Sequence, residues 1–179
     1  MLSVYDDVFD KKWVDELSHL FFHENWKCGN IANRKTWPYG LKGTHNFLGN
    51  TFFKRENNDI IHYDSNLNLS LTLVNAFNAI RNKVNKNLNL KEISANLQFK
   101  GMDGTLHTDG ETNDLVHILM LSNENISEEM GGNFYHEPSD TEIEFRHGRL
   151  IEQGGKDLHK GNAFNKKGIA RFSVKWVSN

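Results

Sequence analysis

The stretch IARFSVKWV at residues 169–177 decides the fold class of this chain. Its side chains alternate between two faces, with Ala170, Phe172, Val174 and Trp176 on one face and Arg171, Ser173 and Lys175 on the other. A period of two with one apolar face is typical of a β-strand that covers a core. We therefore expect the chain to end in a strand of a half-buried sheet.

Five segments upstream of this strand are also rich in strand-forming residues, and turn-forming clusters of glycine, asparagine and aspartate separate them. They are EISANLQF at 92–99, DLVHILMLS at 114–122, GNFYH at 132–136, TEIEF at 141–145 and GRLIE at 148–152. Such a succession of short strands favours an antiparallel barrel or sandwich. Residues 92–179 are thus predicted to form a barrel core.

Residues 1–91 are predicted to support that barrel within one domain, 1–179. LSVYDDVF at 2–9 indicates a short strand, and Asp10 is a suitable N-cap for a helix. Apolar spacings of three or four predict two helices, which carry Trp13, Leu17, Leu20 and Phe21, and then Leu69, Leu73, Phe77, Ile80 and Val84. Residues 25–65, which are rich in aromatics, indicate loops and short strands.

Charge and cysteine content narrow the partners and the compartment. A formal net charge of -2 and a pI near 6.5 give no general attraction to nucleic acid or to anionic membranes. The single cysteine, Cys28, excludes an intramolecular disulfide and a cysteine-rich zinc site. The acidic N-terminus lacks the features of a signal peptide, and no segment has membrane-spanning length. We expect a cytoplasmic protein without a membrane or nucleic-acid partner.

One metal site is suggested by spacing among the histidines. GTLHTDG at 104–110 places His107 and Asp109 two residues apart, so that on an extended strand both side chains point to the same side. His159 lies several predicted strands later, far enough for a neighbouring strand to return it to the same point. Two histidines and one carboxylate suit Fe(II) with open positions, although the ligand types alone do not exclude zinc. The alternative is a surface turn and a loop histidine.

The last strand supplies a candidate anion-binding group. Arg171 follows His159, and a guanidinium that points into a barrel is suited to a bidentate ion pair with a ligand carboxylate. Ser173, on the same face, adds a hydroxyl, and Gln98 is a further candidate contact. The alternative is a solvated outer face, which would suit Lys175 equally well.

Taken in order, His107-Thr108-Asp109, Gly131-Gly132, Gly148-Arg149-Leu150-Ile151, His159 and Arg171-Phe172-Ser173 resemble the 2-oxoglutarate and Fe(II)-dependent oxygenase superfamily, nearest to its prolyl 4-hydroxylase-like branch. The resemblance covers roughly residues 92–177. It implies a mainly β fold with supporting helices, the double-stranded β-helix, which is a jelly-roll or cupin-like barrel.

The resemblance also implies roles for individual residues. His107, Asp109 and His159 would be the catalytic iron ligands, Arg171 would hold the distal carboxylate of 2-oxoglutarate, and Ser173 would be a weaker cosubstrate contact. The cofactors implied are Fe(II), 2-oxoglutarate and O₂, with ascorbate as a reductant. The expected reaction is hydroxylation of a C–H bond in a small molecule or peptide, with a peptidyl (prolyl-type) or free amino acid first.

One departure from the family's pattern and three rival interpretations bear on that expectation. Prolyl hydroxylases usually carry lysine where this chain has Arg171, and this difference weakens the case for a prolyl substrate. The AlkB-like nucleobase branch carries a second arginine six residues further on, where this chain has Val177. A cupin-like metal barrel without oxygen chemistry is the other rival, beside a β-sandwich that binds no metal. The small size resembles microbial and phage-encoded members, so the cytoplasm would be the host's for a phage protein.

Other residues are given structural roles. His117, inside an apolar strand, is predicted to be a core or barrel-lining histidine. For Gly131-Gly132 the structural alternative is a simple turn, because glycine suits positive φ whatever the function. Trp37-Pro38-Tyr39-Gly40 forms either a loop over the site or an aromatic turn packed on the core. Structural or exposed positions are expected for His45, His62, His136 and His147.

Overall fold

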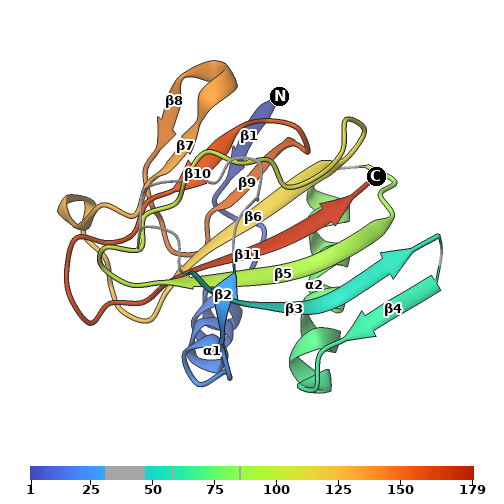
Figure 1. Ribbon diagram of the computed structural model, residues 1–179, viewed down its shortest axis with the longest axis horizontal. Coiled ribbons are helices and arrows are strands. Elements are labelled where there is room, and N and C mark those ends of the chain that lie inside the picture. The colour runs from blue at the N-terminus through green and yellow to red at the C-terminus, as the bar shows by residue number, and fades with distance from the viewer. Residues whose placement is uncertain (31–46, 58, 85) are drawn as a thin grey trace.

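The chain folds as two antiparallel sheets with two α-helices in a computed structural model that describes residues 1–30, 47–57, 59–84 and 86–179 (Figure 1). The helices are α1 (Lys11–Phe22) and α2 (Leu67–Val84). The strands are β1 (Leu2–Tyr5), β2 (Lys27–Asn30), β3 (Phe47–Glu56), β4 (Asp59–Tyr63), β5 (Leu90–Gln98), β6 (Leu115–Ser122), β7 (Phe134–His136), β8 (Thr141–Ile143), β9 (Leu150–Gly154), β10 (His159–Gly161) and β11 (Arg171–Ser178). The mainly β prediction is confirmed.

The main sheet has eight strands in the order β1-β9-β6-β11-β5-β3-β2, with β4 paired to β3. A second sheet of three strands has the order β10-β7-β8. Strand β11 lies in the middle of the main sheet, with β5 on one side and β6 on the other (Figure 1). The helices cover one face of β11, and the second sheet covers the other.

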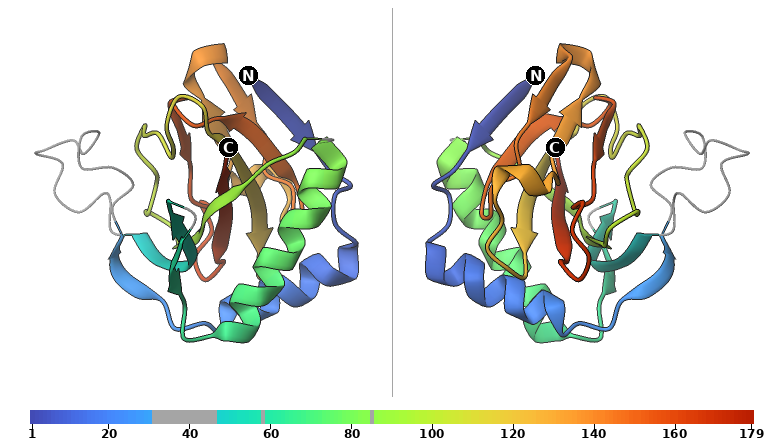
Figure 2. Two further views of the ribbon diagram at one scale, coloured as in Figure 1. Left: turned by 90° about the vertical axis from the view of Figure 1, so that its right-hand side faces the viewer. Right: turned by 90° about the vertical axis from the view of Figure 1, so that its left-hand side faces the viewer.

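Two apolar cores lie on opposite faces of the main sheet. Both helices cover one face (Figure 2), where Leu17 of α1 and Leu73 of α2 pack with Phe172 and Trp176 of β11. The other core, between the two sheets, is formed by residues such as Ile118 of β6. The predicted apolar face of β11 thus turns to the helices, and its polar face turns to the second sheet.

The helices largely follow the predicted pattern. Asp10 caps α1, because its carboxylate accepts a hydrogen bond of 2.8 Å from the Lys12 amide. The exception is Leu20, which is 50% exposed, because the buried stripe of α1 runs through Val14, Leu17 and Phe21 instead. In α2, four of the five predicted core residues are buried, namely Leu69, Leu73, Phe77 and Ile80, while Val84 is partly buried. None of the helices in the described ranges is long and apolar enough to cross a bilayer.

The N-terminal half contributes more to the sheet than its pattern indicates. Strand β1 forms one edge of the main sheet, and β3 pairs with β5 further across it. A register shift between Thr51 and Phe53 leaves the consecutive Phe52 and Phe53 both buried, which breaks the alternation that marks a strand. Residues 37–40 and His45 lie outside the described residues.

A buried charge network ties the end of α2 to the main sheet. Glu152 of β9 has a 1% exposed side chain and lies 2.8 Å from Lys86 Nζ and 3.0 Å from His117 Nε2. Burial alone would raise the pKa of Glu152, but hydrogen bonds from His117 and Lys86 hold it below its usual value. His117 is fully buried, which confirms its predicted core position.

We predict that Glu152→Gln destabilises the protein at neutral pH and much less in acid. Because the folded-state pKa of Glu152 lies below the unfolded value of 4.5, its stabilisation is present above that value and is lost as the pH falls through the folded-state pKa. The expected loss in unfolding free energy at pH 7 is about 1–3 kcal/mol, measured by urea unfolding. Glu111→Gln, which removes an exposed pair with Lys156, should be neutral. Equal losses for Glu152→Gln at pH 7 and pH 3 would contradict the account.

Candidate active site

The three predicted ligands converge between the two sheets. His107 and Asp109 lie in the connection between β5 and β6, and His159 begins β10. Their side-chain ligand atoms all lie within 4.8 Å of one another, and they are the only such group of three among the described residues. His107 is 7% exposed and His159 2% exposed, so the site is shielded from water.

The prediction that His107 and Asp109 lie on a strand is wrong in detail. The segment that contains them belongs to no strand, and only His107 forms an isolated bridge with His159. In this bridge the backbone amide of each residue donates to the carbonyl of the other at 3.0 Å. Convergence therefore comes from one pair of backbone hydrogen bonds that joins the two histidines, not from the pleat of a strand.

Hydrogen bonds orient both imidazoles for metal binding. Nδ1 of His107 lies 2.7 Å from the Thr105 carbonyl, and Nδ1 of His159 lies 3.0 Å from the Asp157 carbonyl. A carbonyl only accepts, so each Nδ1 carries the proton and each Nε2 presents a lone pair toward Asp109. The side-chain amide nitrogen of Gln153 also lies 2.6 Å from Nδ1 of His159. A 180° flip of this amide exchanges its nitrogen and oxygen, so that Oε1, which otherwise has no partner, accepts the Nδ1 proton of His159.

Electrostatics favour the protonation states that a metal needs. Burial lowers the pKa of His107, although Asp109 opposes the shift, so the imidazole is neutral at pH 7. Burial alone would raise the pKa of Asp109, but the Lys175 ammonium 2.9 Å away outweighs it and holds the pKa well below its usual value. Neutral imidazoles and an ionised carboxylate are the forms that coordinate a divalent ion, so the residues present fit one.

Arg171 is a fully buried cation without an acidic partner in the described chain. Its Nε donates to the Gly132 carbonyl at 2.9 Å, and Nη1 donates to Gln98 Oε1 at 2.7 Å and to the Ser173 hydroxyl. Its Nη2 has no hydrogen-bond partner. Burial lowers the pKa of Arg171 to about 10, which still leaves it charged at neutral pH. A buried charge of this kind needs an anion, so Arg171 is poised to bind one.

The cavity that Arg171 enters is the one that the three ligands line. Besides the three ligands and Arg171, its lining includes Gly104, Gly161, Ser173 and Gln98. Gly161 makes room for the guanidinium, because a Cβ there would lie 2.9 Å from Nη2. The structure thus brings together all five predicted site residues, and Gln98 joins them through Arg171.

Gly132 is more than a turn residue. Its φ is +84°, which favours glycine, and a Cβ there would lie 2.3 Å from the Phe164 ring. Its carbonyl is the acceptor that fixes Nε of Arg171. The double glycine therefore lets the backbone approach both the core and the site.

Lys175 is the site residue that the sequence did not single out. Its Nζ lies 2.9 Å from Asp109 Oδ1 and 3.8 Å from Glu92 Oε1. Burial alone would lower the pKa of Lys175, but the two carboxylates raise it. The available signal was its position on the face that Arg171 and Ser173 share, which is enclosed rather than solvated.

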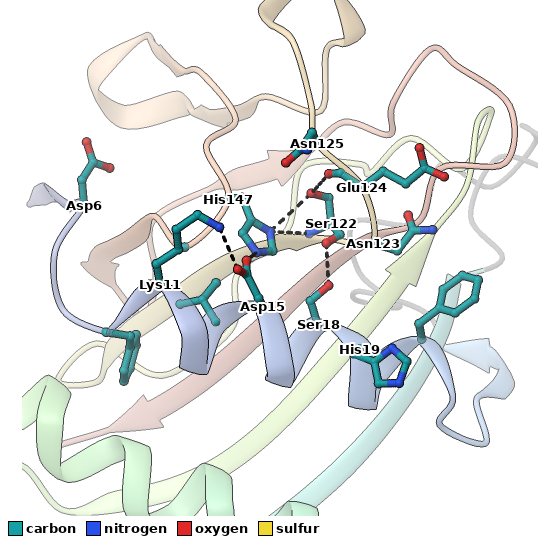
Figure 3. Close-up of a pocket in the computed structure, with 14 residues that line it drawn as sticks. Asp6, Lys11, Asp15, Ser18, His19, Ser122, Asn123, Glu124, Asn125 and His147 are labelled. Atoms are coloured by element: carbon teal, nitrogen blue, oxygen red, sulfur yellow. Dashed lines mark hydrogen bonds and ion pairs between the residues drawn. The ribbon is translucent and has the colours of Figure 1, made fainter.

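A larger hollow elsewhere contains serine, histidine and aspartate in contact (Figure 3). It has a volume of about 820 Å³ beside α1, where Nδ1 of His147 lies 3.3 Å from Ser122 Oγ and Nε2 lies 3.2 Å from Asp15 Oδ1. However, Nδ1 accepts from the Ser122 amide at 3.0 Å, and the hydroxyl donates to the Glu124 carbonyl at 2.8 Å. The hydroxyl is therefore not activated as a nucleophile, and the network joins α1 to the sheet.

Two further histidines for which a structural or exposed position was predicted have structural contacts. His136 lies 3.1 Å from Asp157 and 2.8 Å from Ser139, and Nε2 of His62 lies 2.7 Å from the Thr51 carbonyl. Neither of them joins the metal group. With His147 in the α1 network, the prediction of structural roles is confirmed for these three.

Comparison with solved structures identifies the fold. An oxidoreductase of the 2OG-Fe(II) oxygenase family from Burkholderia pseudomallei matches with a TM-score of 0.71 and 14% identity, over 99% of this chain and 85% of that one. The chain has the fold of the 2-oxoglutarate and Fe(II)-dependent oxygenases. The predicted double-stranded β-helix is confirmed.

Two further structures share this oxygenase fold. The viral collagen prolyl hydroxylase of Paramecium Bursaria Chlorella virus-1, in a 2-oxoglutarate complex, has a TM-score of 0.58 at 14% identity, over 99% of this chain and 95% of that one. HygX from Streptomyces hygroscopicus, with nickel, 2-oxoglutarate and hygromycin B bound, has a TM-score of 0.60 at 12% identity, over 99% and 82%. No protein-family model and no curated protein sequence matches the chain.

We predict that the protein binds one divalent ion through the three ligands. Titration calorimetry with Mn(II) under anaerobic conditions should give one site, and His107→Ala or His159→Ala should weaken binding at least about 100-fold because each removes a coordinating nitrogen. His62→Ala is the control, since this histidine contacts only the Thr51 carbonyl among its described partners. Unchanged binding in His159→Ala would remove the assigned site.

Proposed function

We propose that this protein is a 2-oxoglutarate-dependent Fe(II) dioxygenase that hydroxylates a C–H bond. The observation that carries the proposal is the buried guanidinium of Arg171, which has no acidic partner among the described residues and lines the same cavity as His107, Asp109 and His159. A metal site alone would suit zinc or a cupin-like barrel equally well. A metal site that shares its cavity with an anion site fits a ligand that chelates the metal and carries a second carboxylate.

Each residue then has a defined task. His107, Asp109 and His159 would hold Fe(II), and Arg171, assisted by Ser173, would bind the distal carboxylate of 2-oxoglutarate. When bound, the iron and 2-oxoglutarate supply the oxidising chemistry with O₂, and ascorbate would serve as the reductant that keeps the iron ferrous.

The substrate is proposed to reach the metal from the far side of Asp109. A hollow of about 460 Å³ borders Asp109 there, and charged side chains of both signs dominate its lining, among them Lys54, Glu92 and Lys156. Among the described residues that line this hollow, Val177 is the only one with a branched apolar side chain. A lining of mixed charge suits a polar substrate with both an amine and a carboxylate, such as a free amino acid, or a polar peptide.

We predict that anaerobic addition of Fe(II) and 2-oxoglutarate produces a weak visible charge-transfer band, which forms when a keto acid chelates Fe(II). The band should be absent in His159→Ala. In Arg171→Met it should require at least about 10-fold more 2-oxoglutarate, because a charge-assisted bidentate pair is lost. Ser122→Ala, in the separate α1 network, is the control. Metal binding without a band would favour the cupin-like alternative.

We predict that a free amino acid or a short polar peptide stimulates release of succinate from 2-oxoglutarate. The measurement compares the free amino acids and proline-containing peptides with apolar small molecules and with a methylated single-stranded oligonucleotide. Stimulation by the oligonucleotide alone would contradict the proposed substrate and support the AlkB-like alternative. That alternative is disfavoured by Val177, where the branch has its second arginine, and by the net charge of -2.

A further inference from the structure

We propose that Lys175 is a positioning residue that holds one carboxylate oxygen of Asp109 and leaves the other for the metal. The inference rests on the proposed function, because it concerns how Asp109 meets Fe(II). It starts from an asymmetry: Lys175 Nζ lies 2.9 Å from Oδ1 of Asp109, whereas Oδ2 lies 3.1 Å from Nε2 of His159. Oδ1 is thus held by a cation, with Nε2 of His107 further away at 3.7 Å, whereas Oδ2 has Nε2 of His159 as its nearest neighbour.

The contact is built into the centre of the sheet. Lys175 lies two residues beyond Ser173 on the enclosed face of β11, and its side chain is only 21% exposed. Its carboxylate neighbours in the described chain are Asp109 and, at 3.8 Å, Glu92. Because β11 pairs with both β5 and β6, the backbone of Lys175 is fixed within the sheet.

Without a metal, Lys175 supplies the positive charge that Asp109 needs. The carboxylate is 9% exposed, and an unpaired buried carboxylate is costly. With a metal present, a carboxylate held at Oδ1 offers only Oδ2. Fe(II) held through one oxygen of Asp109 would have room for both a chelating keto acid and O₂, whereas a two-oxygen contact would take up part of that room.

Lys175 is also distinct from the cosubstrate anchor. In prolyl hydroxylases a lysine usually takes the anchor role, which raises the possibility that Lys175 takes it here. However, Lys175 already contacts Asp109, while Arg171 has an unpartnered Nη2 and no acidic neighbour. The two cations therefore divide the work, with Arg171 toward the keto acid and Lys175 toward the metal ligand.

A double-mutant cycle on the metal-free protein tests the pairing. In the presence of a chelator, Lys175→Met should lower the unfolding temperature by about 5 °C or more, but by less than about 2 °C in an Asp109→Asn background, where no carboxylate is left unpaired. Lys86→Met is the matched control, because Lys86 also pairs with a buried carboxylate, that of Glu152, so its cost should be the same in both backgrounds. Lys175→Gln replaces Lys175→Met if the latter does not fold.

The metal-bound protein gives the second measurement. With Fe(II) and 2-oxoglutarate, Lys175→Met should move the charge-transfer band to longer wavelength, because loss of a positive charge beside Asp109 raises electron density on the iron. Lys86→Met should leave the band in place. A wild-type protein without a band would refute the proposed function itself. A wild-type band that does not move in Lys175→Met, or a Lys175→Met cost that is equal in both backgrounds, would overturn this inference alone.

Discussion

The fold and the site depend on the alternation of side chains along β11. This strand lies between β5 and β6 and is enclosed on both faces, so its two sets of side chains meet different demands. Phe172 and Trp176 turn toward the helices, and the indole of Trp176 donates to the Leu73 carbonyl at 2.9 Å. Arg171 and Lys175 turn into the space between the sheets. A register slip of one residue would exchange the two sets and destroy core and site together.

The two buried charges of the site, on Asp109 and Arg171, have opposite kinds of surroundings. The Asp109 carboxylate pairs with the Lys175 ammonium, whereas the acceptors around Arg171 are all neutral: a carbonyl, an amide and a hydroxyl. Excess negative charge is thus compensated within the protein, and excess positive charge is left for a ligand. In the proposed function, this asymmetry would orient a bound dicarboxylate, with one end at the metal and the other at Arg171.

Much of the site could be predicted from the sequence because it follows periodic rules. The alternation in β11 places Arg171 and Ser173 on one face, and the spacing of His107 and Asp109 suggests that both bind the same metal ion. The bridge between His107 and His159 could not be predicted, since it depends on how a loop without regular pattern meets β10. The role of Lys175 could not be predicted, because alternation separates the two faces of a strand but does not show whether the polar face is enclosed or solvated.

The N-terminal half was harder to predict for a physical reason. Strand β3 carries a register shift at Thr51, and consecutive buried aromatics there match neither a helix nor an alternating strand. The capped helix α1 and the apolar stripe of α2 were predictable because capping and helical spacing are local properties. Membership of β1 and β3 in the main sheet is not local, since their partners lie far along the chain.

The most direct measurement is anaerobic crystallography of the protein with Fe(II) and 2-oxoglutarate, with anomalous data collected at the iron edge. The account predicts an anomalous peak among Nε2 of His107, Nε2 of His159 and a single oxygen of Asp109. It also predicts a keto acid that reaches from this peak to the guanidinium of Arg171. A metal bound elsewhere, or a keto acid that does not contact Arg171, would contradict it.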